Sequence, residues 1–363
     1  MLRLTKTSRI LGFLGCLGLL VSCSPRVATS FWRIGTPADS TRAGYTVIHA
    51  EGKTRHCYPI TEWTDSIQPN YVGKGDTYHQ LHHHGVAVES EHMAYRIYFD
   101  KKQTIDPYCK RTPQLELAQS HWYPNDSLLA AGYGDDILRV SGTVGVGSVK
   151  YWNGQKMVHI EPVAERSQRI VSQSHNKATI EVAVKGWEIP LNNYPLNDFS
   201  QHSTLNTQLL DMSVQYTLCA GHRDMRCDVS LSEPVEGLCT GVQFIPAKSS
   251  TPRTPSDTSI IILPNGVLLA SWGTDWPVND SAKYAKETVG LAVFIPKAYA
   301  GALVHDKQNN LCLLRTNKKT KKDTSYTAHF YLTCCGATKE NHPVATNATE
   351  WLIYLRRWAK HLR

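Results

Sequence analysis

The stretch DMSVQYTLCAGHRDMRCDVSLS, residues 211–232, contains two runs in which apolar and polar side chains alternate. Successive side chains of a β-strand point to opposite faces, so each run predicts a strand with one apolar face. Ala220 to Asp224 separate the runs and contain residues typical of a tight turn. The stretch therefore predicts a long antiparallel hairpin that packs one face against a core. Its apolar positions are Met212, Val214, Tyr216, Leu218, Met225, Cys227, Val229 and Leu231.

The same alternation recurs elsewhere in the chain. In HMAYRIYFD, residues 92–100, the apolar side chains from Met93 to Phe99 fall on one face, and Arg96 and Tyr98 fall on the other. ATIEVAV, residues 178–184, repeats the pattern. SIIILPNGVLLASWG, residues 259–273, predicts a second hairpin that turns at Pro264-Asn265-Gly266.

Helical spacing of apolar residues is found at the C-terminus, in residues 347–361, where Thr349 is the expected capping residue. Many strands with regular turns and one short helix predict an all-β protein, a large antiparallel β-sandwich. No internal repeat or linker divides residues 42–363, so we expect them to form a single domain.

The N-terminus has the layout of a secretory signal. Arg3, Lys6 and Arg9 precede an apolar segment from Ile10 to Val21, and small residues lead to Cys23. The apolar segment is shorter than the roughly 20 residues that a spanning helix needs. The pattern resembles the bacterial lipobox, which predicts a signal peptide at 1–22, lipidation of Cys23 and a tether at 23–41. We therefore expect a cell-envelope protein that is anchored to the outer membrane by lipid alone and faces the periplasm.

Charge and cysteine content narrow the function classes. The chain of 363 residues carries a formal net charge of +8, but its basic residues are scattered except for the run at 318–322. No zinc-finger spacing or basic helix accompanies that run, so we do not expect nucleic-acid binding. Cys219 and Cys227 flank the predicted turn of the first hairpin, where a disulfide between them is conceivable in an exported chain. The cysteines show no CxxC pair of the kind that zinc sites use.

Residues 78–110 gather histidines, glutamates and basic residues around an apolar run. If this stretch is a strand, His82 and His84 share a face, and with Glu89 or Glu91 they form a weak zinc signature. An acid–base or sugar-binding role and a polar strand surface are the alternatives. We favour the acid–base or sugar-binding role, with no metal and no cofactor.

Residue types elsewhere fit a carbohydrate ligand, because aromatic rings stack on sugars and guanidinium groups bind carboxylates. The expected acid–base residues are His84, His222, Glu89 and Asp135. The expected substrate-binding residues are Arg96, Tyr98, Arg223, Trp272 and Trp276.

Four long motifs carry a resemblance to a known family, and they occur in the order HHHGVAVESEHMAYRIYFDKKQTIDPYCK, WYPNDSLLAAGYGDDILRVSGTVGVGSVKYWNG, YTLCAGHRDMRCDV and SWGTDWPVNDSAKYAKETVGLAVFIP. The chain resembles a secreted bacterial family, frequent in Bacteroidota, that is designated only as domain of unknown function 4861. This resemblance implies a galactose-mutarotase-like β-supersandwich and a setting among proteins for pectin and other uronate-rich glycans. A fold alone does not establish an activity.

Residue chemistry and resemblance together give two functional hypotheses. In the favoured one, the protein acts on a uronate-containing, pectin-type oligosaccharide by proton abstraction, as a lyase or epimerase. His84 or His222 then serves as acid or base, and Arg96 or Arg223 neutralises the uronate carboxylate. In the alternative, it is a non-catalytic glycan-binding lipoprotein of a polysaccharide-utilisation system.

Overall fold

The computed structural model describes residues 26–35, 45–48, 54–66, 80–120, 123–190, 207–245, 258–278, 284–318 and 324–363. The predicted signal peptide at 1–22 and Cys23 lie outside these ranges. Within them, no helix combines the length and the apolar character needed to cross a bilayer.

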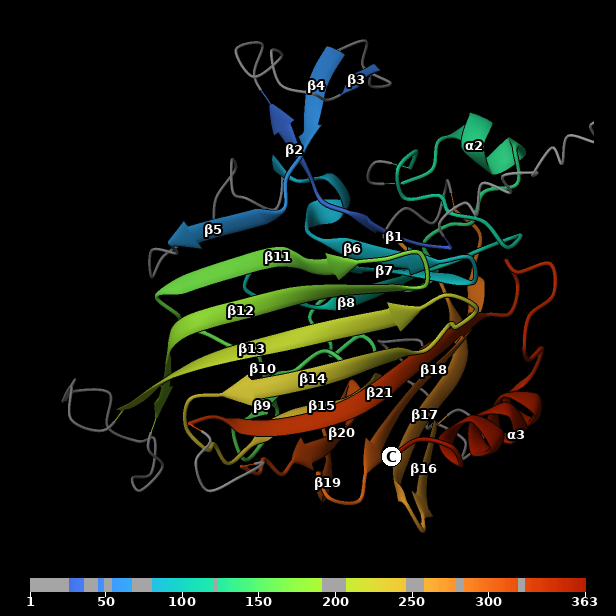
Figure 1. The fold of residues 1–363 in the computed structure, drawn as a ribbon. Helices are drawn as coiled ribbons and strands as arrows, with labels where there is room; N and C mark the ends of the chain where they lie inside the picture. Colours follow the sequence, from blue (N-terminus) through green and yellow to red (C-terminus); the bar gives the residue numbers. More distant parts are fainter. Residues whose placement is uncertain are drawn as a thin grey trace, which may run out of the picture.

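The largest layer is an antiparallel sheet of nine strands, which runs across the front of the molecule in Figure 1. In spatial order its strands are β16 (Thr258–Leu263), β17 (Gly266–Asp275), β18 (Glu287–Pro296), β21 (Tyr326–Gly336), β14 (Met225–Leu231), β13 (Thr207–Cys219), β12 (Lys177–Pro190), β11 (Glu165–Gln173) and β5 (Glu62–Ser66).

Two smaller antiparallel sheets lie behind it (Figure 1). One consists of β1 (Val27–Ser30), β6 (Ala87–Ser90), β7 (Met93–Ile97) and β8 (Ile105–Cys109). The other consists of β10 (Met157–Val158), β9 (Lys150–Trp152), β15 (Leu238–Gln243), β20 (Asn309–Leu314) and β19 (Ala300–His305).

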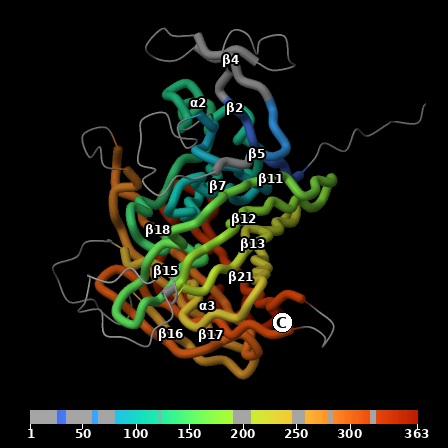
Figure 2. Tube along the Cα trace, turned by 90° about the vertical axis from the view of Figure 1, so that its left-hand side faces the viewer, coloured from blue at the N-terminus to red at the C-terminus, as the bar shows by residue number. Residues whose placement is uncertain are grey.

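A three-stranded sheet stands at the opposite end of the molecule from β16 and β17 in Figure 1, and its strand β2 lies far from β16 and β17 in Figure 2 as well. It comprises β2 (Trp32–Gly35), β4 (Thr54–Pro59) and β3 (Tyr45–Ile48). The helical elements in the described ranges are the 3-10 turn η2 (His82–His84) and the α-helices α2 (Asp126–Ala130) and α3 (Ala348–Ala359).

The hairpin predicted from residues 211–232 is confirmed. β13 and β14 pair antiparallel with Met212 opposite Leu231 and Leu218 opposite Met225. Their apolar positions belong to one buried cluster that also contains Tyr95 of β7 and Val242 of β15. Because this cluster takes side chains from the large sheet and from both smaller sheets, the fold is the expected all-β sandwich.

The second predicted hairpin is confirmed, since β16 and β17 pair antiparallel and meet at the turn before Gly266. Both faces of the first part of β17 are buried, which explains why that strand is apolar. Leu269 lies in the main core, whereas Leu268 and Ala270 pack under α3 with Trp351. The helix adds a third layer over β17 and β18 (Figure 1), so this strand alternates between two apolar environments.

The start of the C-terminal helix differs from the expectation. Asn347, not Thr349, is the N-cap, and its side chain accepts a hydrogen bond from the amide of Glu350 at 3.0 Å. An N-cap residue needs an extended backbone, and Asn347 has φ −149° and ψ 166°. Thr349 lies inside the first turn, where its backbone is already helical.

Part of the predicted tether at 23–41 is folded. β1 pairs antiparallel with β6 at the edge of the four-stranded sheet, and Val27 is completely buried. The prediction of an irregular tether is therefore wrong for residues 27–30. Their backbone groups form hydrogen bonds with β6, and this pairing could not be predicted because residues 27–30 show no strand periodicity of their own.

The cysteines of the described ranges are free thiols. Cys227 lies opposite Tyr216 in the hairpin register, and Cys219 lies opposite Lys177. The disulfide considered for Cys219 and Cys227 is thus absent, because the two residues are not cross-strand neighbours. Six of these thiols are buried, namely Cys109, Cys227, Cys239, Cys312, Cys334 and Cys335.

The packing of α3 yields a stability prediction. Trp351 is 1% exposed and its ring lies 6.4 Å from that of Trp272, so Trp351→Ala should lower the free energy of unfolding by about 3–5 kcal/mol. Ile353→Ala on the exposed side of the helix is the matched control and should change it by less than about 1 kcal/mol. Denaturant unfolding followed by circular dichroism compares the two; equal losses would contradict this account.

Candidate functional site

Arg96 is the centre of a buried charged cluster on β7. Its Nε lies 2.7 Å from Oδ2 of Asp106, and its Nη2 lies 2.6 Å from the same oxygen and 3.2 Å from Oδ2 of Asp136. Asp106 comes from the paired position on β8, whereas Asp136 comes from a later segment that lies beside β8 and bridges to Tyr108. The arginine therefore ties two parts of the chain together.

Two tyrosines complete this cluster. The Arg96 guanidinium donates to the hydroxyl of Tyr98 at 3.2 Å and to that of Tyr123 at 3.3 Å. Tyr98 donates in turn to Asp106 at 2.6 Å. Burial raises the pKa of Asp136 well above its usual value, and the neighbouring Asp106 raises it further against the pull of Arg96. The cluster thus holds two acidic groups against one guanidinium.

The polar face predicted for residues 92–100 is not a solvent-exposed surface. Arg96 is completely buried, because the chain after β8 folds over this side of the four-stranded sheet. Ala94 packs there with Tyr108 and Leu117 in a small second core. The expectation that Arg96 offers an open fork to a ligand carboxylate is wrong for this structure, since two aspartates already occupy the fork.

A hollow of about 390 Å³ lies beside the arginine cluster. It is lined by Lys102, Tyr123, Leu138, Arg139, Val140, Ser141, Gly142, Pro277 and Val278. Tyr123 joins the hollow to the cluster, because its exposed ring lines the hollow and its hydroxyl accepts the hydrogen bond from Arg96. The volume lies within the range of roughly 300–1,000 Å³ found for ligand sites.

Two partly exposed cations line this hollow. The Lys102 side chain is 30% exposed, with its ammonium 3.5 Å from Asp100 and 5.5 Å from the centre of the Tyr98 ring. The Arg139 side chain is 26% exposed, with its guanidinium 2.9 Å from Asp275. Both cations keep a solvent-accessible side, in contrast to Arg96, so the hollow is suited to an anionic group.

The run His82–His84 does not form the strand on which the metal hypothesis rested. It is a 3-10 turn with positive φ at His83 and His84, 54° and 57°. Gly85 follows the turn, and a Cβ at this position would lie 2.1 Å from the carbonyl oxygen of Ile97, so the chain leaving the turn needs a glycine. His83 is buried with Nε2 at 2.9 Å from the carbonyl of Leu117, and burial lowers its pKa well below the usual value.

His84 is the one histidine of the run that is partly exposed, and its ring makes an edge contact with Tyr98 at 6.0 Å. The structure therefore brings together three predicted residues, His84, Arg96 and Tyr98. Within the described ranges, no group of three or more histidine, cysteine or acidic side chains has the arrangement of a metal site.

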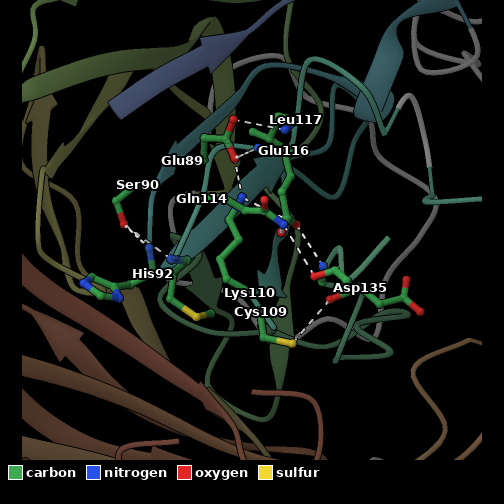
Figure 3. Close-up of polar contacts among 12 residues, drawn as sticks. Glu89, Ser90, His92, Cys109, Lys110, Gln114, Glu116, Leu117 and Asp135 are labelled. Atoms are coloured by element: carbon green, nitrogen blue, oxygen red, sulfur yellow. Dashed lines mark hydrogen bonds and ion pairs between the residues drawn. The ribbon is translucent and has the colours of Figure 1, made fainter. Parts of the chain in front are cut away.

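Glu89 is placed as a structural anchor rather than as an exposed base. Its carboxylate binds the ammonium of Lys110 and accepts hydrogen bonds from the amides of Glu116 at 2.8 Å and Leu117 at 3.0 Å. Figure 3 shows Lys110, Glu116 and Leu117, which all follow β8 in the chain, converging on Glu89. Glu89 is 1% exposed, so it has no open side for a substrate.

Asp135 belongs to a third buried charged cluster. Lys339 lies 3.5 Å from Asp135 and 3.3 Å from Glu287, and Thr338 donates to Glu287 at 2.5 Å. Burial raises the pKa of both carboxyl groups, although the nearby lysine opposes the shift. Asp135 and Asp136 are consecutive, yet one faces Lys339 and the other faces Arg96.

His222 and Arg223 form a separate group at the turn of the first hairpin. Arg223 makes a two-point ion pair with Glu340 at 3.1 and 3.2 Å and donates to the carbonyl of Cys334. His222 is exposed and pairs with Asp224 at 3.1 Å. Neither residue lines the hollow beside Tyr123.

The two predicted tryptophans also separate. Trp272 packs against Trp351 and belongs to the layer beneath α3. Trp276 lies next to Pro277, which lines the hollow, and its ring is 4.3 Å from the Lys286 ammonium. Only Trp276 is therefore adjacent to the candidate site.

Sequence reasoning missed three side chains that line the hollow, Lys102, Tyr123 and Arg139. Lys102 had a usable signal, because it directly follows the strand of residues 92–100 where a loop would expose it. Tyr123 and Arg139 had none, since their position depends on the path that the chain takes after β8.

The chain belongs to the family described as a domain of unknown function, DUF4861, whose profile matches residues 36–363. No curated protein matches the sequence, and neither does any solved structure.

The arginine cluster predicts a large effect of a single substitution. Arg96→Ala leaves two buried carboxyl groups without their cation, so the free energy of unfolding should fall by about 3–5 kcal/mol. Arg226→Ala is the control, since that ion pair is 43% exposed on the arginine side and should contribute at most about 1 kcal/mol. A loss for Arg96→Ala as small as that of the control, measured by denaturant unfolding, would rule out the anchoring role.

Proposed function

We propose that the hollow beside Lys102, Tyr123 and Arg139 binds a carbohydrate that carries a carboxylate, such as a uronate-containing, pectin-type oligosaccharide. The observation that carries the proposal is that two partly exposed cations and one partly exposed tyrosine line a single hollow. Cations attract and hold a carboxylate, and an aromatic ring offers a face for a sugar. Lys102 and Arg139 take the part that the sequence had suggested for Arg96 and Arg223.

The chemistry that this arrangement supports is proton transfer next to the uronate carboxylate. Neutralising the carboxylate makes the C5 proton more acidic, because charge develops on the carboxylate when that proton leaves. In β-elimination a base takes the C5 proton, a C4–C5 double bond forms, and the C4–O bond breaks towards the departing sugar oxygen. An epimerase instead returns a proton to C5 from the opposite face.

Tyr123 is the proposed proton donor to the departing oxygen. Burial raises the pKa of its phenol despite the nearby Arg96, so the hydroxyl holds its proton at neutral pH. Arg96 donates to the phenol oxygen, which leaves the tyrosine proton for another acceptor. The proposed base is His84, which contacts Tyr98 of the arginine cluster next to the hollow but is not itself part of the hollow's lining.

Non-catalytic glycan binding is the second candidate function. One observation favours it: Glu89 and Asp135, two of the expected acid–base residues, are buried in ion pairs away from the hollow. A binding protein needs the cations and aromatic rings of the hollow but no converging acid and base.

The binding experiment compares charged and neutral ligands. Lys102→Ala and Arg139→Ala should each weaken the affinity for a galacturonate oligosaccharide by about ten- to hundredfold, because each removes a charge-assisted contact. Affinity for the matching neutral galactose oligosaccharide should stay within about threefold. Lys297→Ala, at an exposed lysine outside the hollow, is the matched control. Calorimetry on both ligands decides, and failure of the wild type to bind the acidic ligand would overturn the proposal.

Product formation separates the two candidates. A lyase yields an unsaturated uronate that absorbs in the ultraviolet, and an epimerase exchanges the C5 hydrogen with solvent. In either case Tyr123→Phe should slow turnover by about a hundredfold or more while ligand affinity changes little. Binding without either product would establish the non-catalytic function.

We also propose that the fold is of the galactose-mutarotase-like supersandwich type, and that the protein is an exported lipoprotein of the cell envelope. Support for the first comes from the nine-stranded sheet that covers two smaller sheets, and for the second from the lipobox-like sequence before Cys23. The proposed orientation is towards the periplasm.

The anchor has its own test. Cys23→Ala should move the protein from the membrane fraction to the soluble fraction or leave an uncleaved precursor, because the lipid is attached to that thiol. Fractionation and the mass of the mature chain are the measurements. Cys16→Ala, inside the predicted signal, is the control that should process normally. Unchanged processing and membrane association of Cys23→Ala would disprove lipidation.

A further inference from the structure

A second hollow, of about 630 Å³, adjoins the first. It is lined by Gly142, Gln155, Lys156, Met157, Val158, His159, Glu161, Asp306, Lys307, Gln308 and Asn309. Gly142 lines both hollows, so they meet at this residue. Both volumes lie in the range of roughly 300–1,000 Å³ typical of ligand sites.

Gly142 is not required by the fold. A Cβ at this position would have no other atom within 4 Å, and the backbone is not in the left-handed region that favours glycine. The residue is exposed, and it follows Ser141 at the boundary between the hollows. The absence of a side chain therefore leaves that boundary open without contributing to packing.

A buried amine connects the walls of the two hollows. Lys150 donates to the carbonyl of Lys102, whose side chain lines the first hollow, and to the hydroxyl of Thr104 at 2.9 Å. Its ammonium lies 3.4 Å from Nδ1 of His159, which lines the second hollow. Lys150 thus links a residue of the first hollow, Lys102, to a residue of the second, His159, through contacts in the protein interior.

The second hollow has polar groups suited to sugar hydroxyls and to a further carboxylate. Burial and the nearby Lys150 lower the pKa of His159 to about 3, so its ring is neutral. The Asp306 carboxylate accepts hydrogen bonds from the backbone amides of Met157, Gln308 and Asn309, so its oxygens already have partners within the protein. Lys156 and Lys307 are exposed cations of the lining, and Glu161 is its acidic residue besides Asp306.

We propose that the two hollows form one elongated cleft, and that an extended acidic oligosaccharide lies across Gly142 with its distal sugars between Lys156, His159 and Lys307. This inference rests on the proposed function and specifies its substrate class, a chain long enough to occupy both hollows rather than a single sugar or a short fragment. The observation that supports this inference is that Gly142 lines both hollows and has no side chain to separate them.

The test uses galacturonate oligomers of two lengths, a trimer and an octamer. Wild-type protein should bind the octamer at least about tenfold more tightly than the trimer, because the longer chain gains contacts in the second hollow. Gly142→Leu should abolish that advantage, so that the octamer and the trimer bind with affinities within about threefold of each other. Gly142→Ala is the small-side-chain control and should retain most of the advantage. Lys156→Ala with Lys307→Ala should weaken the octamer alone.

The measurements are calorimetry, or KM where the ligand is turned over, with circular dichroism to verify folding of each variant. Equal wild-type affinities for the two lengths would overturn the elongated cleft while leaving the first hollow as the binding site. Equal losses for trimer and octamer in Gly142→Leu would also overturn it, since the side chain would then obstruct the first hollow itself. Failure of both oligomers to bind the wild type would overturn the proposed function together with this inference.

Discussion

The ion cluster of Arg96 with Asp106 and Asp136 is the interaction on which the candidate site depends. An unpaired guanidinium inside a protein is very unfavourable, so Asp106 and Asp136 both lie against Arg96 in the fold. The segment that contains Asp136 lies beside β8 at the edge of the four-stranded sheet, and Arg139, three residues later, lines the hollow together with Tyr123. The arginine also fixes the Tyr123 hydroxyl, which links the anchoring of the fold to the proposed chemistry.

The arginine cluster is one of three built in the same way. In each, one buried or half-buried cation contacts two carboxylates: Arg96 with Asp106 and Asp136, Lys110 with Glu89 and Glu116, and Lys339 with Asp135 and Glu287. All three attach the chain between β8 and residue 139 to the body of the protein. Each carries more acidic groups than basic ones, whereas the accessible cations Lys102 and Arg139 pair with Asp100 and Asp275 outside these clusters.

Local periodicity allowed much of the fold to be predicted, because the side-chain alternation of a strand is a property of neighbouring residues. The hairpin of residues 211–232 and the helix near Trp351 follow from such patterns. The outer face of β7 could not be predicted, because its cover comes from residues far along the chain. For the same reason the sequence assigned Arg96 a surface role, since its partner Asp136 is 40 residues away.

The buried thiols have a practical consequence for following how the molecule opens. Burial raises the pKa of Cys227 and Cys239, so neither forms the reactive thiolate while its sheet is intact. Cys227 lies on β14 in the middle of the nine-stranded sheet, and Cys239 lies on β15 in the five-stranded sheet. In native buffer, the rate at which an alkylating reagent modifies each cysteine therefore reports how often the sheet around that cysteine opens. The order in which the two cysteines become labelled reveals whether the layers come apart together or one before the other.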